Sequence, residues 1–302
     1  MMGKPPKVVI VILNWNGFEE TIECVDSISR IEYSNYKILI VDNGSDSNEI
    51  DNIVLQFPFV KIIKSKENLG FSGGNNLGIE YAIKLNADFI LLLNNDTIVE
   101  PNFLGILVHH STQNINVGIL VPKINYYINQ NRIWYAGGYI SKFRGSGFTI
   151  GQDESGEKYS NNKYVTFATG CCLLIKMEVI KKIGLMDPQY FLYLEDVDYC
   201  LRNNLKGYKI LYIGKSKIYH KVSISSNKQN NLASLYYVTR NRFYFAKKFY
   251  PNFYYIPFLY ITIIFFIKIL YWFISGENEK IKIAKKAISD YIFNKMGKSE
   301  DL

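Results

Sequence analysis

Strands and helices alternate through the first half of this 302-residue chain, and the alternation limits the folds open to it. Continuous apolar runs at 7–13, 36–42, 60–64 and 88–94 are typical of strands buried on both faces of a sheet. Apolar residues at helical spacing separate these runs. Repeated strand–helix–strand units predict an α/β fold with a mostly parallel central sheet, right-handed crossovers and flanking helices.

Polar residues follow three of these strands where each strand ends. They occupy 14–17, 42–46 and 94–96. Ligands of open α/β sheets bind beyond the carboxyl ends of the strands. We therefore expect the three segments to line one crevice.

Asn94, Asn95 and Asp96 carry the donor atoms of a magnesium site. Mg²⁺ prefers oxygen ligands and often takes only one or two from the protein, with the rest from phosphates and water. A cation held here against a diphosphate would stabilise the charge on a departing nucleotide. The alternative is that Asp96 or Thr97 caps a helix expected after Pro101.

Two other segments fit a nucleotide. Asp42, at the end of the second strand, can accept the imide N–H of uracil or thymine. Alternatively it forms an Asx turn, with Ser45 and Asp46 capping the next helix. The stretch ENLGFSGGNNLGIEYA (67–82) lets backbone approach a ligand and offers helix N–H groups to a phosphate, or is only a glycine-rich turn. The stretch has neither the dinucleotide-binding fingerprint nor the lysine of a P-loop. The missing fingerprint disfavours a dehydrogenase.

The stretch LYLEDVDYCLR (192–202) predicts a helix that begins near Glu195 and carries the acid Asp196 in its first turn. An acid here can take a proton from an attacking hydroxyl. Because a helix N-terminus lowers a carboxyl pKa, we expect a base that is ionised but weak. An ordinary acidic first turn is the alternative. His220, at a strand end, is either a metal or phosphate contact or a structural histidine.

The pattern loosens after about residue 117. Further strands are expected at 118–124, 132–140, 164–176, where Gly170 breaks the strand, and 208–213. A polar loop region is expected over 141–163 and a helix over 230–249. The four cysteines, which have no metal spacing, are expected to be free thiols in a reducing, cytoplasmic compartment.

The apolar stretch 256–274 has Lys268 as its only charge and about the roughly 20 residues that cross a bilayer. Pro257 and the lysines on both flanks, at 247–248 and 280–286, favour a helix or hairpin in the cytoplasmic leaflet. A helix docked wholly on the protein is the alternative. The net charge of +8 fits a membrane surface, and no nucleic-acid partner is expected.

Seven stretches occur in the order found in glycosyltransferase family 2, the inverting group with the GT-A fold, which the chain resembles over about 7–250. They are VVIVILNWNG, ILIVDNGSDS, NLGFSGGNN, LLLNND, ATGCCLLIK, YFLYLEDVDYCLR and YYVTRNRFYFAKK. The nearest subgroup is rhamnosyltransferase-like. The resemblance implies a single catalytic domain over 1–250, with a nucleotide-sugar half (about 1–125) and an acceptor half (about 126–250). Helices over 251–302 would associate with the membrane.

The resemblance also implies roles for individual residues. Asp196 would be the general base, with Glu195 beside it, and Asp96 and His220 would hold a divalent cation, Mg²⁺ or Mn²⁺. Contacts to the nucleotide sugar would come from Asn14, Trp15, Asp42, Asn68, Gly73, Asn75, Asn94 and Asn95. Arg240 and Arg242 would lie near phosphates of the donor or of a lipid acceptor. Since many relatives have acids in place of Asn94 and Asn95, weaker metal binding is expected.

The implied activity is inverting transfer of a sugar to a lipid-linked or cell-surface saccharide at the cytoplasmic face of the membrane, with peripheral or monotopic attachment. Rhamnose from dTDP-rhamnose is favoured, and a UDP-sugar remains open. One alternative is a non-catalytic scaffold for glycan assembly, which the presence of Asp42, Asp96 and Asp196 disfavours. Another is a sugar nucleotidyltransferase, which would need a basic loop after the first strand, whereas NWNGFEE is acidic.

Overall fold

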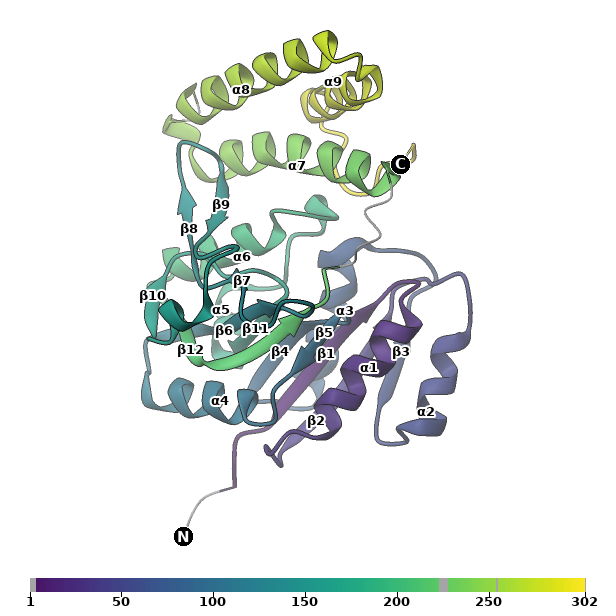
Figure 1. Cartoon of the computed structure of the whole chain (residues 1–302), viewed down its shortest axis with the longest axis vertical. Coiled ribbons are helices and arrows are strands. Elements are labelled where there is room, and N and C mark those ends of the chain that lie inside the picture. Colours follow the sequence, from purple (N-terminus) through teal and green to yellow (C-terminus); the bar gives the residue numbers. More distant parts are fainter. Residues whose placement is uncertain (1–3, 223–227, 254, 302) are drawn as a thin grey trace.

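The computed structural model describes residues 4–222, 228–253 and 255–301. Within them lies a ten-stranded sheet whose main path runs β10-β12-β6-β11-β4-β1-β2-β3 (Figure 1). Strand β5 pairs with β12 and β7 pairs with β6. The strands are β1 Val8–Asn14, β2 Tyr36–Asp42, β3 Lys61–Lys64, β4 Phe89–Asn94, β5 Thr97–Val99, β6 Val117–Tyr126, β7 Ile133–Tyr135, β10 Lys163–Val165, β11 Cys172–Lys176 and β12 Lys209–His220.

The four strands predicted in the first half form the parallel part of the sheet. β1 pairs in parallel with β2 and β4, and β2 with β3. The register places Asn14 opposite Asp42 and Leu13 opposite Asn94, so the three polar segments start at one edge of the sheet. The predicted α/β architecture is confirmed.

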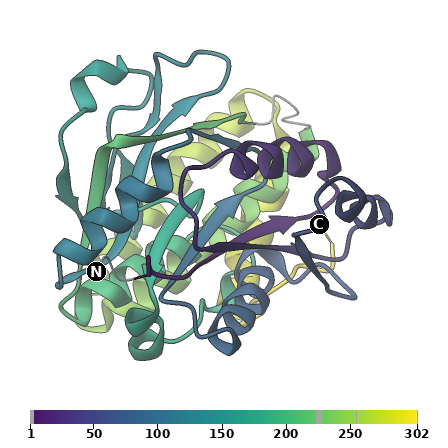
Figure 2. The same ribbon diagram turned by 90° about the horizontal axis from the view of Figure 1, so that it is seen from below.

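Helices cover both faces of the sheet, with α1 and α3 on opposite sides of the parallel strands (Figure 2). Gly78 of α3 lies against the Val11 side chain, so the helix sits close to the sheet. The helices of this part are α1 Phe18–Ser29, η1 Glu49–Asn52, α2 Ile53–Gln56, α3 Gly70–Lys84, α4 Phe103–Gln113, η2 Gly156–Tyr159, α5 Met177–Ile183, η3 Pro188–Tyr190 and α6 Glu195–Leu205.

Two predicted strands of the second half are wrong in extent. The stretch 132–140 is divided into β7 and β8 (Gly138–Ser141), because Gly137, with φ of 98°, turns the chain between them. The stretch 164–176 is divided, as the expected break at Gly170 implies, into β10 and β11, which are not neighbours in the sheet. The expected loop region contains β9 (Ser146–Thr149), which forms a hairpin with β8.

The chain after the sheet forms a layer of three helices beyond the carboxyl ends of the strands (Figure 1). They are α7 Lys228–Phe249, α8 Tyr255–Ile274 and α9 Asn278–Ile292, with the short η4 Pro251–Phe253 between the first two. The hairpin of β8 and β9 rises to this layer. At its turn, Gly145 lies close to Ile261 of α8 and Ala246 of α7.

Helix α8 is docked along one face only. Ile261, Phe265 and Trp272 are buried against the neighbouring helices. The helix is long and apolar enough to cross a membrane, yet only 22% of its most apolar window is buried within the protein. The helix is therefore docked on the protein along one face, and its other face is exposed.

Candidate functional site

Asp42 is held at the bottom of the crevice by Asn14 and Ser45. The Asn14 amide donates to Asp42 Oδ1 at 3.0 Å, and the Ser45 hydroxyl donates to the same oxygen at 2.6 Å. Asn14 Oδ1 accepts a hydrogen bond from the Thr21 hydroxyl, which fixes the amide orientation. Ser45 therefore closes the turn around Asp42, and the helix η1 that follows begins three residues beyond Asp46 with Asn48 at its N-cap.

Hydrogen bonds join the loops after β1, β2 and β3 into one rim. Asn16 and Asp46 exchange two hydrogen bonds between the first two loops. Asn43 donates to Asn68 Oδ1 at 3.0 Å and accepts from the backbone of Leu69, which ties in the third loop. The crevice expected from the strand order is therefore a connected structure.

Trp15 stands at the mouth of this crevice with 55% of its surface exposed. Its neighbour Asn16 adopts φ of 52°, a left-handed conformation that asparagine tolerates better than most residues. An exposed aromatic ring beside a buried carboxylate offers a stacking surface for a planar base.

Asn95 joins the end of β4 to the start of α1. Its amide donates to the Gly17 carbonyl at 3.2 Å and to the Thr21 hydroxyl at 3.0 Å. A Cβ on Gly17 would lie 2.6 Å from the Asn95 amide nitrogen, so glycine is needed there. Asn94 is half-buried at the strand end beside it.

Asp96 and His220 form a partly satisfied polar pair beside the crevice. Asp96 Oδ2 lies 3.1 Å from His220 Nε2, and the Trp134 ring packs edge-on against the imidazole. Asp96 Oδ1 and His220 Nδ1 are buried and have no hydrogen-bond partner among the described residues. Buried polar atoms without partners are costly, so this pair has unused capacity for a ligand.

The donor set of the pair fits a divalent cation. Carboxylate oxygen and imidazole nitrogen both suit Mn²⁺, and Asp96 oxygen suits Mg²⁺. In the described part of the chain no group of three His, Cys, Asp or Glu side chains is placed to hold a metal ion, so phosphate and water would complete the shell. The capping alternative for Asp96 is wrong, because β5 begins at Thr97 and Asn102 caps α4.

Helix α3 has fewer free backbone N–H groups for a phosphate than its glycine-rich start predicts. The Gly70 N–H donates to Asn68 Oδ1, and the Phe71 N–H donates to the Phe191 carbonyl. Asn75 is buried and donates to the Phe71 carbonyl within the helix, so it does not face the crevice. Gly73 meets only the Leu69 side chain.

Asp196 and Glu195 open helix α6, as predicted. Asp196 Oδ2 accepts the Gly170 N–H at 2.9 Å and Oδ1 accepts the Val197 N–H at 2.8 Å. Glu195 is buried, and its Oε2 has no partner in the described part of the chain.

The expectation that Asp196 is a weak base is wrong. Burial raises the pKa of Asp196 to about 6, although its backbone hydrogen bonds act in the opposite direction. Burial, together with the charge of Asp196, raises the pKa of Glu195 well above its usual range. Desolvation therefore outweighs the helix N-terminus, and Asp196 is the member of the pair that is ionised at neutral pH.

The loop that leads into Asp196 is strained. Phe191, Tyr193 and Leu194 have φ of 60°, 68° and 71°. Side chains with a Cβ adopt this left-handed region at a cost of about 1–2 kcal/mol each. Contacts from elsewhere must therefore hold the loop in place.

Arg240 and Asn241 of α7 supply these contacts. The Asn241 amide donates to the carbonyls of Tyr190, Leu192 and Tyr193, each at 2.9 Å. Arg240, fully buried, donates to the carbonyls of Gln189 and Tyr190 and to two carbonyls of the C-terminal segment, those of Lys295 and Gly297. The prediction that Arg240 contacts a phosphate is therefore wrong, because backbone carbonyls occupy its donors.

A pocket of about 410 Å³ opens beside the carboxylate of Asp196. Tyr193 and Leu194 of the strained loop form one wall, and Arg242 of α7 forms another. Arg144, from the hairpin of β8 and β9, and Tyr260 of α8 close it on the side of the helical layer. An acid with a raised pKa facing a pocket is suited to remove a proton from a bound hydroxyl.

The family profile described as glycosyl transferase family 2 matches residues 8–184, more than half of the chain. The chain belongs to glycosyl transferase family 2. As a glycosyltransferase it moves a sugar from a nucleotide donor, and the scaffold and nucleotidyltransferase alternatives are not supported.

Curated relatives of this glycosyltransferase differ in the sugar that their names state. The low-salt glycan biosynthesis hexosyltransferase Agl10 of Haloferax volcanii is 28% identical over 78% of this chain and 73% of its own. The dTDP-rhamnosyl transferase RfbF of Shigella flexneri is 23% identical over 80% of each chain. The N-acetylglucosaminyl-diphospho-decaprenol L-rhamnosyltransferase of Mycobacterium tuberculosis is 23% identical over 67% of this chain and 72% of its own.

Solved structures confirm the GT-A fold of this glycosyltransferase. The mannosyltransferase PcManGT of Pyrobaculum calidifontis, in complex with GDP-Man and Mn²⁺, matches 95% of this chain and 75% of its own, with a TM-score of 0.60 and 12% identity. GalNAc-T7 with UDP, GalNAc and Mn²⁺ matches 72% of this chain and 44% of its own, with a TM-score of 0.60 and 18% identity.

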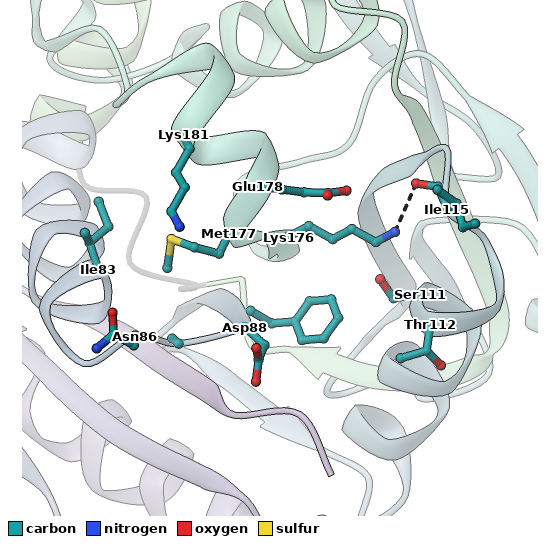
Figure 3. A pocket seen from close by; sticks show the side chains of 12 residues that line it. Ile83, Asn86, Asp88, Ser111, Thr112, Ile115, Lys176, Met177, Glu178 and Lys181 are labelled. Carbon is teal, nitrogen blue, oxygen red and sulfur yellow. Dashed lines mark hydrogen bonds between the residues drawn. The ribbon is translucent and has the colours of Figure 1, made fainter. Parts of the chain in front are cut away.

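A second cavity, of about 720 Å³, has Asp88, Lys176 and Lys181 among the residues that line it (Figure 3). It surrounds Asp88 and Phe89, where β4 begins, and Lys176, where β11 ends. Lys176 turns to the carbonyl oxygens of Asn114 and Ile115, to which its amine donates. Ligands of α/β sheets bind at the carboxyl ends of strands, so this cavity is not where we place the chemistry.

Proposed function

We propose that this glycosyltransferase moves rhamnose, with inversion, from dTDP-rhamnose to a lipid-linked saccharide at the cytoplasmic face of the membrane. Two properties of Asp196 carry the proposal. Its pKa is raised to about 6, and its side chain lines a pocket next to the strand-end crevice. Residues 1–125 would hold the donor and 126–250 the acceptor, with 251–302 as the membrane-associated part. Relatives named for dTDP-rhamnose support the choice of donor.

On the donor side, Asp42 would accept the imide N–H of the pyrimidine, and Trp15 would stack on the base. Asn14, Asn68, Asn94 and Asn95 would complete this part of the site. Asp96 and His220 would hold the divalent cation, which supplies positive charge to the diphosphate as it leaves. The short contact between Asp96 Oδ2 and His220 Nε2 and the unpartnered Asp96 Oδ1 support this assignment.

On the acceptor side, Asp196 would remove the proton of the acceptor hydroxyl. The hydroxyl oxygen would attack the anomeric carbon on the face opposite the nucleoside diphosphate. The new C–O bond forms as the bond to the diphosphate oxygen breaks, and the diphosphate leaves with that electron pair. Glu195, whose pKa is raised by burial and by the charge of Asp196, would stand beside the base.

The proposal predicts an acid limb in the pH–rate profile with a midpoint near pH 6. The base must be ionised, and the pKa of Asp196 is raised to about 6 by burial. Transfer is therefore full above this pH and falls as the pH drops through it. Initial rates at saturating donor between pH 4.5 and 8 measure the midpoint. A midpoint below pH 5 would exclude Asp196 in its buried state as the base.

Donor binding is expected to depend on a divalent cation and on Asp96. Calorimetric titration with dTDP-rhamnose and Mn²⁺ should give saturable binding, which a chelator weakens at least tenfold. Asp96→Asn should weaken binding in Mn²⁺ by a similar factor, because it removes the anionic ligand. Asp51→Asn, on η1, is the matched control and should bind as the wild type does. Equal binding with and without a cation would refute the assignment of Asp96.

Membrane attachment would come from α8. The outward side of this helix is apolar, with Phe266, Tyr271 and Phe273 more than half exposed. On α9, Lys282 and Lys285 are exposed, where they would meet anionic headgroups. An in-plane helix with its inner face on the protein fits both features.

A further inference from the structure

The pocket beside Asp196 holds two arginines whose charges are not neutralised. Arg144 and Arg242 line it from the hairpin and from α7. In the part of the chain that the structure describes, no ion pair joins either guanidinium to a carboxylate, whereas Arg202 nearby pairs with Asp198. Among the described residues, Arg242 donates to the backbone carbonyl of Arg144 alone.

The two charges also act on each other. Burial and the neighbouring charge of Arg144 lower the pKa of Arg242. A guanidinium remains protonated under all ordinary conditions, so the pair keeps its positive charge in a partly desolvated place. An anion with several oxygens would relieve this repulsion and accept from the free guanidinium N–H groups.

The same pocket continues onto the exposed face of α8. Tyr260 lines the pocket, and residues three or four positions away lie on the same helix face. Ile256, Ile263 and Ile267 occupy that face and are 49%, 48% and 56% exposed. An apolar strip therefore leads from the mouth of the pocket along the helix that we assign to the membrane surface.

We propose that Arg144 and Arg242 bind the phosphate groups of a lipid-linked acceptor, between its sugar and its hydrocarbon chain. The sugar would reach Asp196 inside the pocket, and the chain would lie along Ile256, Ile263 and Ile267. Such a molecule carries a sugar, then phosphate groups, then a hydrocarbon chain. In the same order the protein presents the Asp196 carboxylate, the two arginines and the apolar strip of α8. This inference rests on the proposed transfer to a lipid-linked saccharide and adds the phosphate-bearing carrier that the site selects.

The test uses farnesyl diphosphate as the probe, with the full chain and a chelator present to suppress cation-dependent binding in the donor crevice. Arg144→Gln with Arg242→Gln should weaken binding of farnesyl diphosphate at least tenfold. Farnesol, which lacks the phosphates, should bind the wild type and the double variant alike. Arg30→Gln, at the C-cap of α1, removes an arginine charge outside the pocket and should not change binding of farnesyl diphosphate. Unchanged binding of farnesyl diphosphate by the double variant would overturn the proposal.

Two further measurements distinguish a site for the carrier phosphates from a fold defect and from contact with bilayer headgroups. The single variant Arg144→Gln changes an exposed side chain and leaves the half-buried Arg242 in place, so a fold defect at Arg242 cannot cause its effect. It should also weaken binding of farnesyl diphosphate. Sedimentation with phosphatidylglycerol vesicles should be the same for the wild type and the double variant. If the variant instead loses vesicle binding and keeps farnesyl diphosphate, the arginines contact bilayer headgroups and the proposal is wrong.

Donor titration distinguishes failure of this inference from failure of the proposed function. The double variant should bind dTDP-rhamnose in Mn²⁺ as the wild type does, since the donor crevice is intact. If the wild type binds farnesyl diphosphate through the arginines and binds no nucleotide sugar, the proposed donor is wrong while the phosphate site stands. If it binds the donor and the arginines do not matter, only the phosphate site is wrong.

Discussion

Replacing Asp196 with asparagine is expected to lower sugar transfer at least a thousandfold while leaving donor binding unchanged. General base catalysis contributes typically about 10²–10⁴-fold, and the amide cannot take the proton. The Gly170 and Val197 N–H groups donate to different oxygens of Asp196, so the single oxygen of asparagine can accept from only one of them. The size and shape of the side chain are otherwise retained, so the start of α6 should keep its geometry. Transfer rates and calorimetric donor titration together measure the two effects.

The stability of this variant separates a catalytic loss from a structural one. Burial raises the pKa of Asp196 in the folded protein, so its ionisation disfavours the folded state above that pH. Asparagine removes this cost but leaves one backbone N–H without its acceptor, so the two effects oppose each other and the melting temperature at pH 8 should change little. Asp153→Asn, far from the pocket on the loop after β9, is the matched control for rate. A variant that transfers sugar at more than a tenth of the wild-type rate would exclude Asp196 as the base.

Replacing Asn241 with alanine is expected to affect both stability and turnover, although Asn241 touches no substrate. Its amide donates to three carbonyls of the strained loop, of which that of Tyr190 also accepts from Arg240. The variant therefore takes this donor from the carbonyls of Leu192 and Tyr193, and a buried carbonyl left without a donor costs about 1–3 kcal/mol. We expect the free energy of unfolding to fall by about 2–4 kcal/mol. Because a displacement of about 1 Å at a reacting group can cost 10²-fold, kcat should fall by about that factor.

The pH–rate profile of this variant tests positioning directly. A relaxed loop admits water to Asp196, which lowers its pKa toward the ordinary value, so the acid limb should move to lower pH. The KM for the donor should not change, since the donor crevice lies elsewhere. Asn114→Ala is the matched control, because its amide also donates to a backbone carbonyl, that of His110, at the end of α4. An acid limb that stays in place in Asn241→Ala would show that Asn241 acts on stability alone.

The donor crevice could be predicted because it depends on local patterns. Parallel strands place their carboxyl ends at one edge, so the positions of Asp42 and Asp96 followed from where two apolar runs end. The start of α6 at Glu195 was likewise visible in the sequence. The surroundings of Asp96 and His220 could be predicted only in part. The Trp134 ring that packs on His220 comes from β7, a strand with no polar motif.

The rest of the site depends on long-range packing that periodicity does not report. Charged and polar residues of a helix usually face solvent. Arg240 and Asn241 of α7 are instead buried beneath the loop that they hold. The only sign was the polar triplet RNR inside an aromatic stretch. The raised pKa of Asp196 could not be predicted either, because burial in the folded protein outweighs the backbone hydrogen bonds that the carboxylate accepts. The strands of the β8 and β9 hairpin are short and polar, so their sequence is typical of a loop.

Transfer of labelled sugar to lipid is the most direct test of the proposed function. The full chain would be incubated with Mn²⁺, lipids extracted from membranes, and either labelled dTDP-rhamnose or labelled UDP-glucose. We predict that rhamnose enters the organic-soluble fraction, that its anomeric configuration is inverted in the NMR spectrum of the product, and that Asp196→Asn forms none. Transfer with retained configuration, or no transfer of rhamnose under conditions where glucose is transferred, would contradict the proposal.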